Sequence, residues 1–200
     1  MPRNVVVYLG DYVDRGPDSR GVIDMLRGDA LPGFERVFLK GNHEASLLRF
    51  LAEAEHGLQW FAYGGDATLY SYGVGAPRAP TDPVGLQRVK SEFACQLPPE
   101  HLAFFNSLRL MHTEDDYLFV HAGLRPGVRL EDQNAEDLLW IRDEFLTSDA
   151  EFGKIIVHGH SISTAPVVRR NRIGIDTGAF AGGPLTCLVL EGTNRTFLTS

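Results

Sequence analysis

Two carboxylates and an arginine stand close together near the start of the chain, at Asp11, Asp14 and Arg15. The apolar run before them, residues 5–9, is rich in β-branched and aromatic side chains and predicts a buried strand. In open α/β sheets, ligands bind just beyond the carboxyl ends of strands, which is where this cluster falls. Carboxylates there can hold a cation, and an arginine can fork onto phosphate oxygens. Taken alone, the cluster fits a helix N-cap with a surface salt bridge equally well.

Three later strand ends also carry polar groups beside glycine. They are Asn42 with His43, His121, and His160. A lone histidine at a strand end is usually structural, because such residues often satisfy backbone groups. Four strand ends bearing Asp, Asn, His and His make coincidence a poor explanation. Mixed oxygen and imidazole ligation suits Mn, Fe or Zn better than Ca or Mg, so we predict a site for a divalent metal of this group.

The elements that must position these groups alternate along the chain. Apolar residues at helical spacing predict helices over 19–27, after Glu44, and over 84–96, 99–108 and 135–145. Strand, polar cluster and helix occur twice in succession near the start, which is the pattern of a layered α/β domain. Residues 57–83 mix aromatics with glycines and are predicted to be less regular, and residues 73–83 have the composition of a loop. The second half is richer in strands, so we predict two packed sheets with helices outside.

Composition sets limits on size, partners and compartment. Two hundred residues suffice for a single domain, 1–200. The net charge of -7 argues against nonspecific nucleic-acid binding, which needs a basic face. No signal peptide or bilayer-spanning apolar run is evident, so we expect a cytoplasmic protein with no nucleic-acid and no membrane partner. Cys95 and Cys187 lie in unrelated contexts, which predicts two reduced, buried thiols.

The chemistry-bearing motifs resemble, in order, those of the metallophosphoesterase superfamily and its phosphoprotein-phosphatase branch. They are Gly-Asp-Tyr-Val-Asp-Arg-Gly at 10–16, Gly-Asn-His-Glu at 41–44, His-Ala-Gly at 121–123 and Gly-His at 159–160. The first motif is highly specific, and together they cover most of the chain. The resemblance implies a calcineurin-like metallophosphoesterase β-sandwich, an α/β fold with two packed mixed β-sheets flanked by helices. It also implies a bacterial type of serine/threonine phosphatase.

The resemblance further implies a ligand set for two metal ions. Asp11 would bridge both ions, and Asn42, His121 and His160 would complete the shell of the second. His158, two positions before His160, would lie on the same face of a regular strand and would at most support the ligands.

Four residues would carry out the remaining chemistry in proteins with these motifs. His43 would be the general acid that protonates the leaving oxygen, and Asp14 would orient its imidazole. Arg15 would bind the phosphate, and Arg142, in Trp140-Ile141-Arg142, resembles the family's second phosphate-binding arginine. A histidine beside a carboxylate suits proton transfer near neutral pH.

This chain lacks the Gly-Asp-x-His-Gly motif that normally precedes these segments in the family. The missing Asp and His are ligands of the first metal, so we expect one metal to bind well, the other poorly or not at all, and activity to be weakened. The missing first strand would pair beside residues 5–9. Because an exposed strand edge invites pairing, we also expect a homo-oligomer formed through that edge.

Three functions fit these residues. The first is a serine/threonine protein phosphatase that cleaves a phosphoprotein or small phosphoester by direct attack of metal-activated water. The second is a symmetrical dinucleoside tetraphosphate hydrolase, for which the aromatic residues of 57–72 could stack an adenine. The third is a catalytically impaired phosphate-binding protein. Retention of His43 and Asp14 argues against the third, since a pure binder needs no acid.

Overall fold

The computed structural model describes residues 3–29, 31–79 and 81–200. The start of the chain at Met1-Pro2 therefore lies outside the described residues. The chain divides into two compact units. Unit 1 contains the residues up to Val6 and Gly10–Leu108, and unit 2 contains Val7–Leu9 and Arg109–Ser200. The expectation of a single domain over 1–200 stays a prediction.

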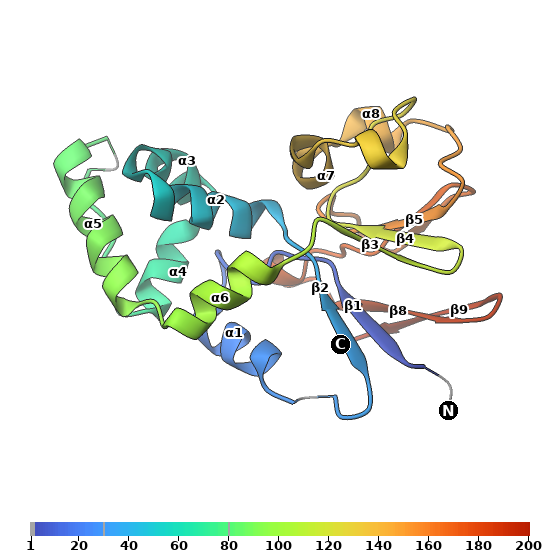
Figure 1. The fold of residues 1–200 in the computed structure, drawn as a ribbon, viewed down its shortest axis with the longest axis horizontal. Coiled ribbons are helices and arrows are strands. Elements are labelled where there is room, and N and C mark those ends of the chain that lie inside the picture. Colours follow the sequence, from blue (N-terminus) through green and yellow to red (C-terminus); the bar gives the residue numbers. More distant parts are fainter. Residues whose placement is uncertain (1–2, 30, 80) are drawn as a thin grey trace. The chain divides into compact units, whose positions relative to one another are not determined.

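Unit 1 is mostly helical and carries a short two-stranded sheet (Figure 1). Strand β1 (Val5–Tyr8) begins in this unit and pairs with β2 (Glu35–Phe38). The other elements are α1 (Ser19–Arg27), α2 (Asn42–Ala52), η1 (Ala54–His56), α3 (Gly57–Ala62), α4 (Gly65–Ser71), α5 (Pro83–Gln96) and α6 (Pro99–Ser107).

The helix predicted over 19–27 has those bounds, and the side chain of Asp18 caps its first turn by accepting from the N–H of Gly21. The prediction of a less regular segment is wrong up to Ser71, where α3 and α4 lie, whereas the described residues between Gly73 and the start of α5 form a loop, as predicted. Gly64 has a φ of 95° and separates these two short helices. Neither helix is long enough for an apolar period to be recognised in the sequence.

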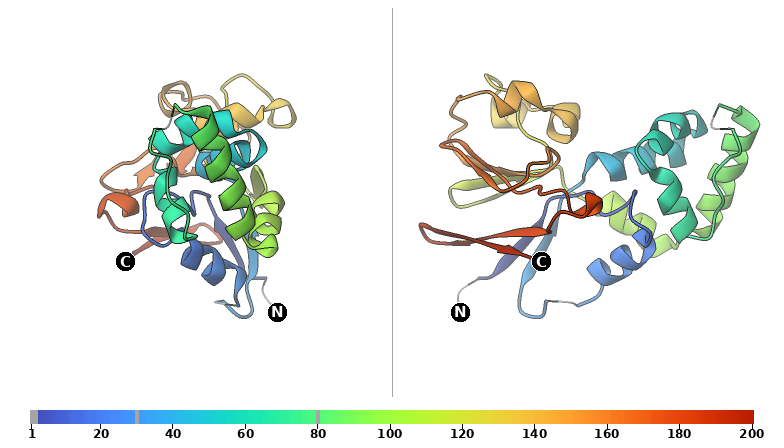
Figure 2. Two further views of the ribbon diagram at one scale, coloured as in Figure 1. Left: turned by 90° about the vertical axis from the view of Figure 1, so that its left-hand side faces the viewer. Right: turned by 180° about the vertical axis from the view of Figure 1, so that it is seen from behind.

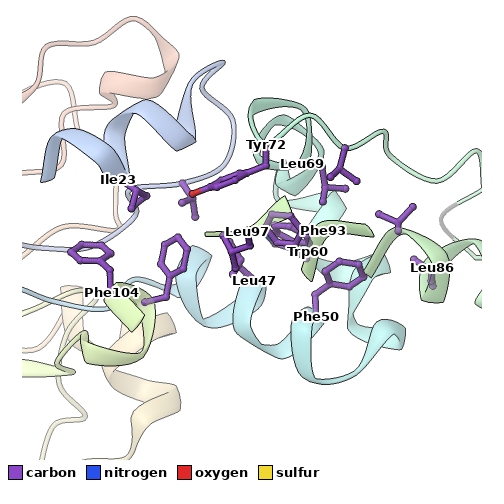
Figure 3. Packing of buried hydrophobic residues seen from close by; sticks show 14 of the residues in the cluster. Ile23, Leu47, Phe50, Trp60, Leu69, Tyr72, Leu86, Phe93, Leu97 and Phe104 are labelled. Carbon is purple, nitrogen blue, oxygen red and sulfur yellow. The ribbon is translucent and has the colours of Figure 1, made fainter. Parts of the chain in front are cut away.

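The core of unit 1 forms where these helices meet. Trp60 of α3 packs against Phe50 of α2 and Phe93 of α5, with ring centroids 5.0 and 5.8 Å apart (Figure 3). All three side chains are fully buried. Burial of large aromatic side chains is a strong stabilising term, so the segment after residue 57 is an integral part of this core.

Unit 2 is built on a five-stranded sheet in the order β3-β4-β5-β7-β6. Strands β4, β5 and β7 are parallel, and β3 and β6 pair antiparallel at the two edges. The strands are β3 (Met111–Glu114), β4 (Tyr117–Val120), β5 (Ile155–His158), β6 (Val167–Val168) and β7 (Arg172–Gly174), followed by the hairpin of β8 (Thr186–Glu191) and β9 (Asn194–Thr199). The helices are α7 (Ala135–Trp140) and α8 (Asp143–Leu146), with single turns η2 (Leu130–Asp132) and η3 (Ala179–Ala181).

The two faces of the five-stranded sheet bury different partners. Leu118 and Ile156 pack with residues of α7 and α8, such as Phe145. Residues next to them in the strands point the other way, and Val157 packs with Leu188 of the β8–β9 hairpin, drawn in red in Figure 2. The prediction of a mixed α/β fold with packed sheets flanked by helices is therefore confirmed.

Three predictions of detail are corrected in the structure. The helix predicted over 135–145 is interrupted at Ile141 and Arg142, and Arg142 has φ −131° and ψ −100°, outside the helical region. The apolar pattern of residues 108–112 predicts the first strand of a hairpin there, but β3 begins at Met111 and extends to Glu114, which pairs with Tyr117.

The third correction concerns the cysteines, which are both exposed. Cys95 lies outside the buried stripe of α5 that contains Val89 and Phe93. Cys187 alternates with Leu188 along β8, and it is Leu188 that packs in the apolar cluster.

Among the residues that the structure describes, none of the helices is long and apolar enough to cross a membrane.

His158, the last residue of β5, is buried and packs edge-on against Phe145, with ring centroids 5.1 Å apart. Its Nδ1–H donates to the carbonyl of Gly159 at 3.1 Å. Burial, to which the positive charge of Arg172 adds, lowers the pKa of His158 to about 4. The ring is therefore neutral in the folded protein at neutral pH.

We predict that this titration makes the fold acid-sensitive. Between pH 6.5 and 4 the unfolded chain binds a proton that the folded chain does not, so the free energy of unfolding falls as the pH falls through this window. The loss is up to about 1.4 kcal/mol per pH unit. When the free energy of unfolding is measured with urea at several pH values, it should change less steeply with pH in His158→Leu than in wild type. If the free energy of unfolding depends on pH as steeply in His158→Leu as in wild type and in His56→Leu, a control at a half-buried histidine, the assignment is contradicted.

Candidate active site

The segment between β1 and α1 has an unusual backbone. Asp11, Asp14 and Arg15 have φ values of 59°, 73° and 60°, in the left-handed region that side-chain-bearing residues seldom adopt. Each such residue stores of order 1–3 kcal/mol of strain, which persists only where the surroundings hold it. We call residues 10–16 the carboxylate loop.

Glu44, in the first turn of α2, holds the start of the carboxylate loop. Its carboxylate is fully buried and accepts from the backbone N–H groups of Tyr12 at 2.6 Å, Asp11 at 2.9 Å and Gly41 at 2.8 Å. Burial, followed by the negative charge of Asp11, raises the pKa of Glu44 to about 7. The three N–H donors act in the opposite direction and stabilise the charged form.

The start of α2 lies directly against Asp11. A Cβ atom at Gly41 would fall 2.0 Å from Asp11 Oδ1, so only glycine permits this close approach. The N–H of His43 donates to the same Oδ1 at 3.3 Å. Asn42 is buried as the first residue of the helix. Unit 1 therefore brings the expected ligand Asp11 to the helix end that carries the expected ligand Asn42.

Asp14 and His43 form a close pair in unit 1. His43 Nδ1 lies 2.7 Å from Asp14 Oδ2, and the Asp14 side chain is completely inaccessible to solvent. Burial raises the pKa of Asp14, although the hydrogen bond with His43 opposes the shift. Burial lowers the pKa of His43, but the hydrogen bond to Asp14 and nearby carboxylates outweigh it, so the net shift is upward. The sequence prediction that Asp14 orients His43 agrees with this contact.

Arg15 follows this pair and is exposed. Its backbone N–H donates to the carbonyl of Gly64 at 3.1 Å, which fixes its left-handed conformation. Tyr63, the residue before Gly64, packs edge-on against the His43 ring at a centroid distance of 6.2 Å. The turn between α3 and α4 therefore contacts both residues, a relation that the sequence did not indicate.

Unit 2 contains the two expected histidine ligands. His121 directly follows β4, and His160 follows β5 by two residues with a φ of 61°. His160 is thus outside the strand, so the alternation of a regular strand does not relate its side chain to that of His158. The His121 and His160 rings lie 5.0 Å apart, and ligand nitrogens of the two lie within 4.8 Å of each other.

The surroundings of His121 suit a metal ligand. Its Nδ1–H donates to the carbonyl of Leu9 at 2.7 Å, which leaves Nε2 as the nitrogen with the lone pair. Metal-binding histidines commonly donate the second ring N–H to a backbone carbonyl in this way. Gly123, in the same motif, accommodates Phe145, whose ring carbon would lie 2.3 Å from a Cβ atom at that position.

Arg142 lies in the break between α7 and α8 of unit 2. It is exposed, and its Nη1 donates to the carbonyl of His160 at 3.2 Å and to Ser161 Oγ at 3.4 Å. Unit 2 therefore brings Arg142 to the segment that contains His160.

The donor groups fit a divalent transition metal. Unit 1 offers a carboxylate and an amide oxygen, and unit 2 offers two imidazoles; Mn, Fe and Zn accept ligands of each kind. Asp11 and Asn42 are the oxygen donors in question, and His121 and His160 are the nitrogen donors.

Comparison with known proteins agrees with this chemistry. Residues 2–182 match the family of calcineurin-like phosphoesterases, which are metal-dependent hydrolases. The chain is 27% identical over 198 residues to serine/threonine-protein phosphatase 1 of Salmonella typhimurium, covering 92% of this chain and 77% of that protein. It is 24% identical over 206 residues to the asymmetrical bis(5′-nucleosyl)-tetraphosphatase of Halalkalibacterium halodurans, covering 92% and 74%.

A solved structure shares the fold. The crystal structure of a protein assigned as a diadenosine tetraphosphatase superposes with a TM-score of 0.61 at 20% identity, covering 96% of this chain and 79% of that one. Because the family match spans most of the sequence, the chain belongs to the calcineurin-like phosphoesterase family.

Proposed function

We propose that this protein is a metal-dependent phosphoester hydrolase that acts as a serine/threonine protein phosphatase. The observation that carries the proposal is the buried contact of 2.7 Å between His43 and Asp14, at the strand end that also bears Asp11. A protein that only binds phosphate has no use for an imidazole held by a carboxylate. The family match and the phosphatase relative at 27% identity support the same reading.

We assign Asp11, Asn42, His121 and His160 as metal ligands. Manganese is the proposed ion, because this donor set combines hard oxygens with imidazoles. Such ions, when bound, neutralise charge on the phosphoryl oxygens and lower the pKa of an attacking water. Glu44 keeps Asp11 in place through the backbone of the carboxylate loop.

We assign proton transfer to His43. With Nδ1 bonded to Asp14, Nε2 is the atom that can deliver a proton to the leaving oxygen. The upward shift of the His43 pKa keeps a larger fraction of the ring protonated near neutral pH, as a general acid requires. Arg15 and Arg142 would bind the phosphate oxygens, for which a guanidinium is suited.

A second candidate is hydrolysis of dinucleoside polyphosphates. It is favoured by the relative from Halalkalibacterium halodurans and by the fold of the structure assigned as a diadenosine tetraphosphatase. In this reading Tyr63, which packs against His43, would lie beside the leaving group. The same general acid would serve both reactions.

We predict that the 200-residue chain hydrolyses p-nitrophenyl phosphate when Mn²⁺ is supplied, and that a chelator abolishes turnover. His43→Ala should lower kcat by about a hundredfold or more, because general acid catalysis contributes 10²–10⁴-fold. His56→Ala, a half-buried histidine of the same unit, is the matched control. Turnover that needs no metal, or that is equal in His43→Ala and His56→Ala, would contradict the proposal.

The substrate class is tested by direct competition. We predict a higher kcat/KM for a phosphoserine peptide than for diadenosine tetraphosphate, measured with Mn²⁺ in the same buffer. The reverse order would assign the protein to the second candidate. Binding of both compounds without turnover of either would identify a phosphate-binding protein.

A further inference from the structure

The carboxylate of Asp14 is bonded by side chains from three helices of unit 1. His43 of α2 contacts Oδ2, Trp60 Nε1 of α3 donates at 3.0 and 3.1 Å to the two oxygens, and Thr68 Oγ1 of α4 donates to Oδ1 at 2.6 Å. A buried carboxylate without such donors would be strongly unfavourable. Both oxygens therefore have fixed partners, and the plane of the carboxylate is set by them.

Thr68 contacts Asp14 twice. Its hydroxyl accepts from the backbone N–H of Asp14 at 2.8 Å and donates its one proton to the carboxylate of the same residue. The proton in the 3.1 Å contact between Ser19 Oγ and Thr68 Oγ1 must then come from Ser19. The Thr68 hydroxyl thus bonds both the left-handed backbone and the side chain of Asp14, and Ser19 Oγ accepts from the same backbone N–H at 3.1 Å.

Trp60 is held rigidly by its packing. Its ring lies 5.0 Å from Phe50, 5.5 Å from Phe61 and 5.8 Å from Phe93, measured between ring centroids. Figure 3 shows it inside the cluster of buried side chains, with Leu47 and Leu97 nearby. The indole N–H is its only donor, and that donor is directed at Asp14.

We propose that Trp60 and Thr68 are positioning residues for proton transfer by His43. The inference rests on the proposed function. The two side chains hold the Asp14 carboxylate so that Oδ2 stays on His43 Nδ1 and the imidazole keeps one orientation. A group displaced by about 1 Å can lose about a hundredfold in rate, so small rotations of this carboxylate matter. In this proposal, Trp60 and Thr68 act through Asp14 and His43 and do not contact the substrate.

Two phosphate esters whose leaving groups differ in their need for a proton distinguish a positioning role of Trp60 and Thr68 from a purely structural one. Phenyl phosphate releases a basic phenolate that needs a proton, whereas 2,4-dinitrophenyl phosphate releases an anion that leaves without one. For Thr68→Val and Trp60→Phe we expect kcat on phenyl phosphate to fall about 10- to 100-fold. We expect a much smaller change in kcat on 2,4-dinitrophenyl phosphate, and an unchanged KM for both esters.

Two variants control for stability. Thr68→Ser keeps the hydroxyl and should restore kcat on phenyl phosphate to near the wild-type value. Thr186→Val removes another buried hydroxyl, which contacts Thr177 at 2.7 Å in unit 2, and should leave the ratio of the two kcat values unchanged. An equal loss on both esters in Thr68→Val, or the same change of ratio in Thr186→Val, would overturn the inference.

A second readout does not depend on turnover. In ¹⁵N-labelled protein, Thr68→Val should shift the ring nitrogen signals of His43 and the indole N–H signal of Trp60, because all three side chains share one carboxylate. If wild-type protein hydrolyses neither ester, the proposed function fails, and these signals alone decide the positioning role. Unchanged His43 signals in Thr68→Val would then overturn it.

Discussion

The carboxylate of Glu44 is the interaction on which the candidate site depends. It is fully buried, and it accepts from three backbone N–H groups in two separate segments of unit 1. A carboxylate in such a position is costly unless hydrogen-bonded, and hydrogen bonds to a charged group contribute more than those to a neutral one. The same bonds hold Asp11 in a left-handed backbone conformation that would otherwise relax. The Glu44 side chain thus stabilises this part of the fold and also maintains the strained backbone of Asp11.

The helical core of unit 1 extends this constraint from the backbone to the chemistry. Phe50 and Phe93 fix Trp60, and Trp60 together with Thr68 fixes Asp14, the partner of His43. Helices α3 and α4 therefore bury apolar surface and also supply hydrogen-bond donors to Asp14. The packing of these helices holds the Asp14 carboxylate in one orientation, and an imidazole that transfers a proton, such as that of His43, requires this support.

The motif residues were the part of the site that could be predicted from the sequence, because their residue types and their order indicate the chemistry without any knowledge of packing. The helix at 19–27 was equally clear, since its apolar residues recur at helical spacing. Trp60 and Thr68 were not recognisable, because long-range hydrogen bonds leave no periodic signal. The break at Arg142 was also hidden, since its apolar neighbours continue the helical spacing while its side chain bonds the carbonyl of His160.

The central claim is that Glu44 holds the carboxylate loop through backbone hydrogen bonds, and amide hydrogen exchange measures this directly. We predict slow exchange of the N–H groups of Asp11, Tyr12 and Gly41 in the wild-type protein. Glu44→Ala should accelerate all three together, while Glu53→Ala, an exposed glutamate just after α2, should not. Continued protection of these amides in folded Glu44→Ala would contradict the account.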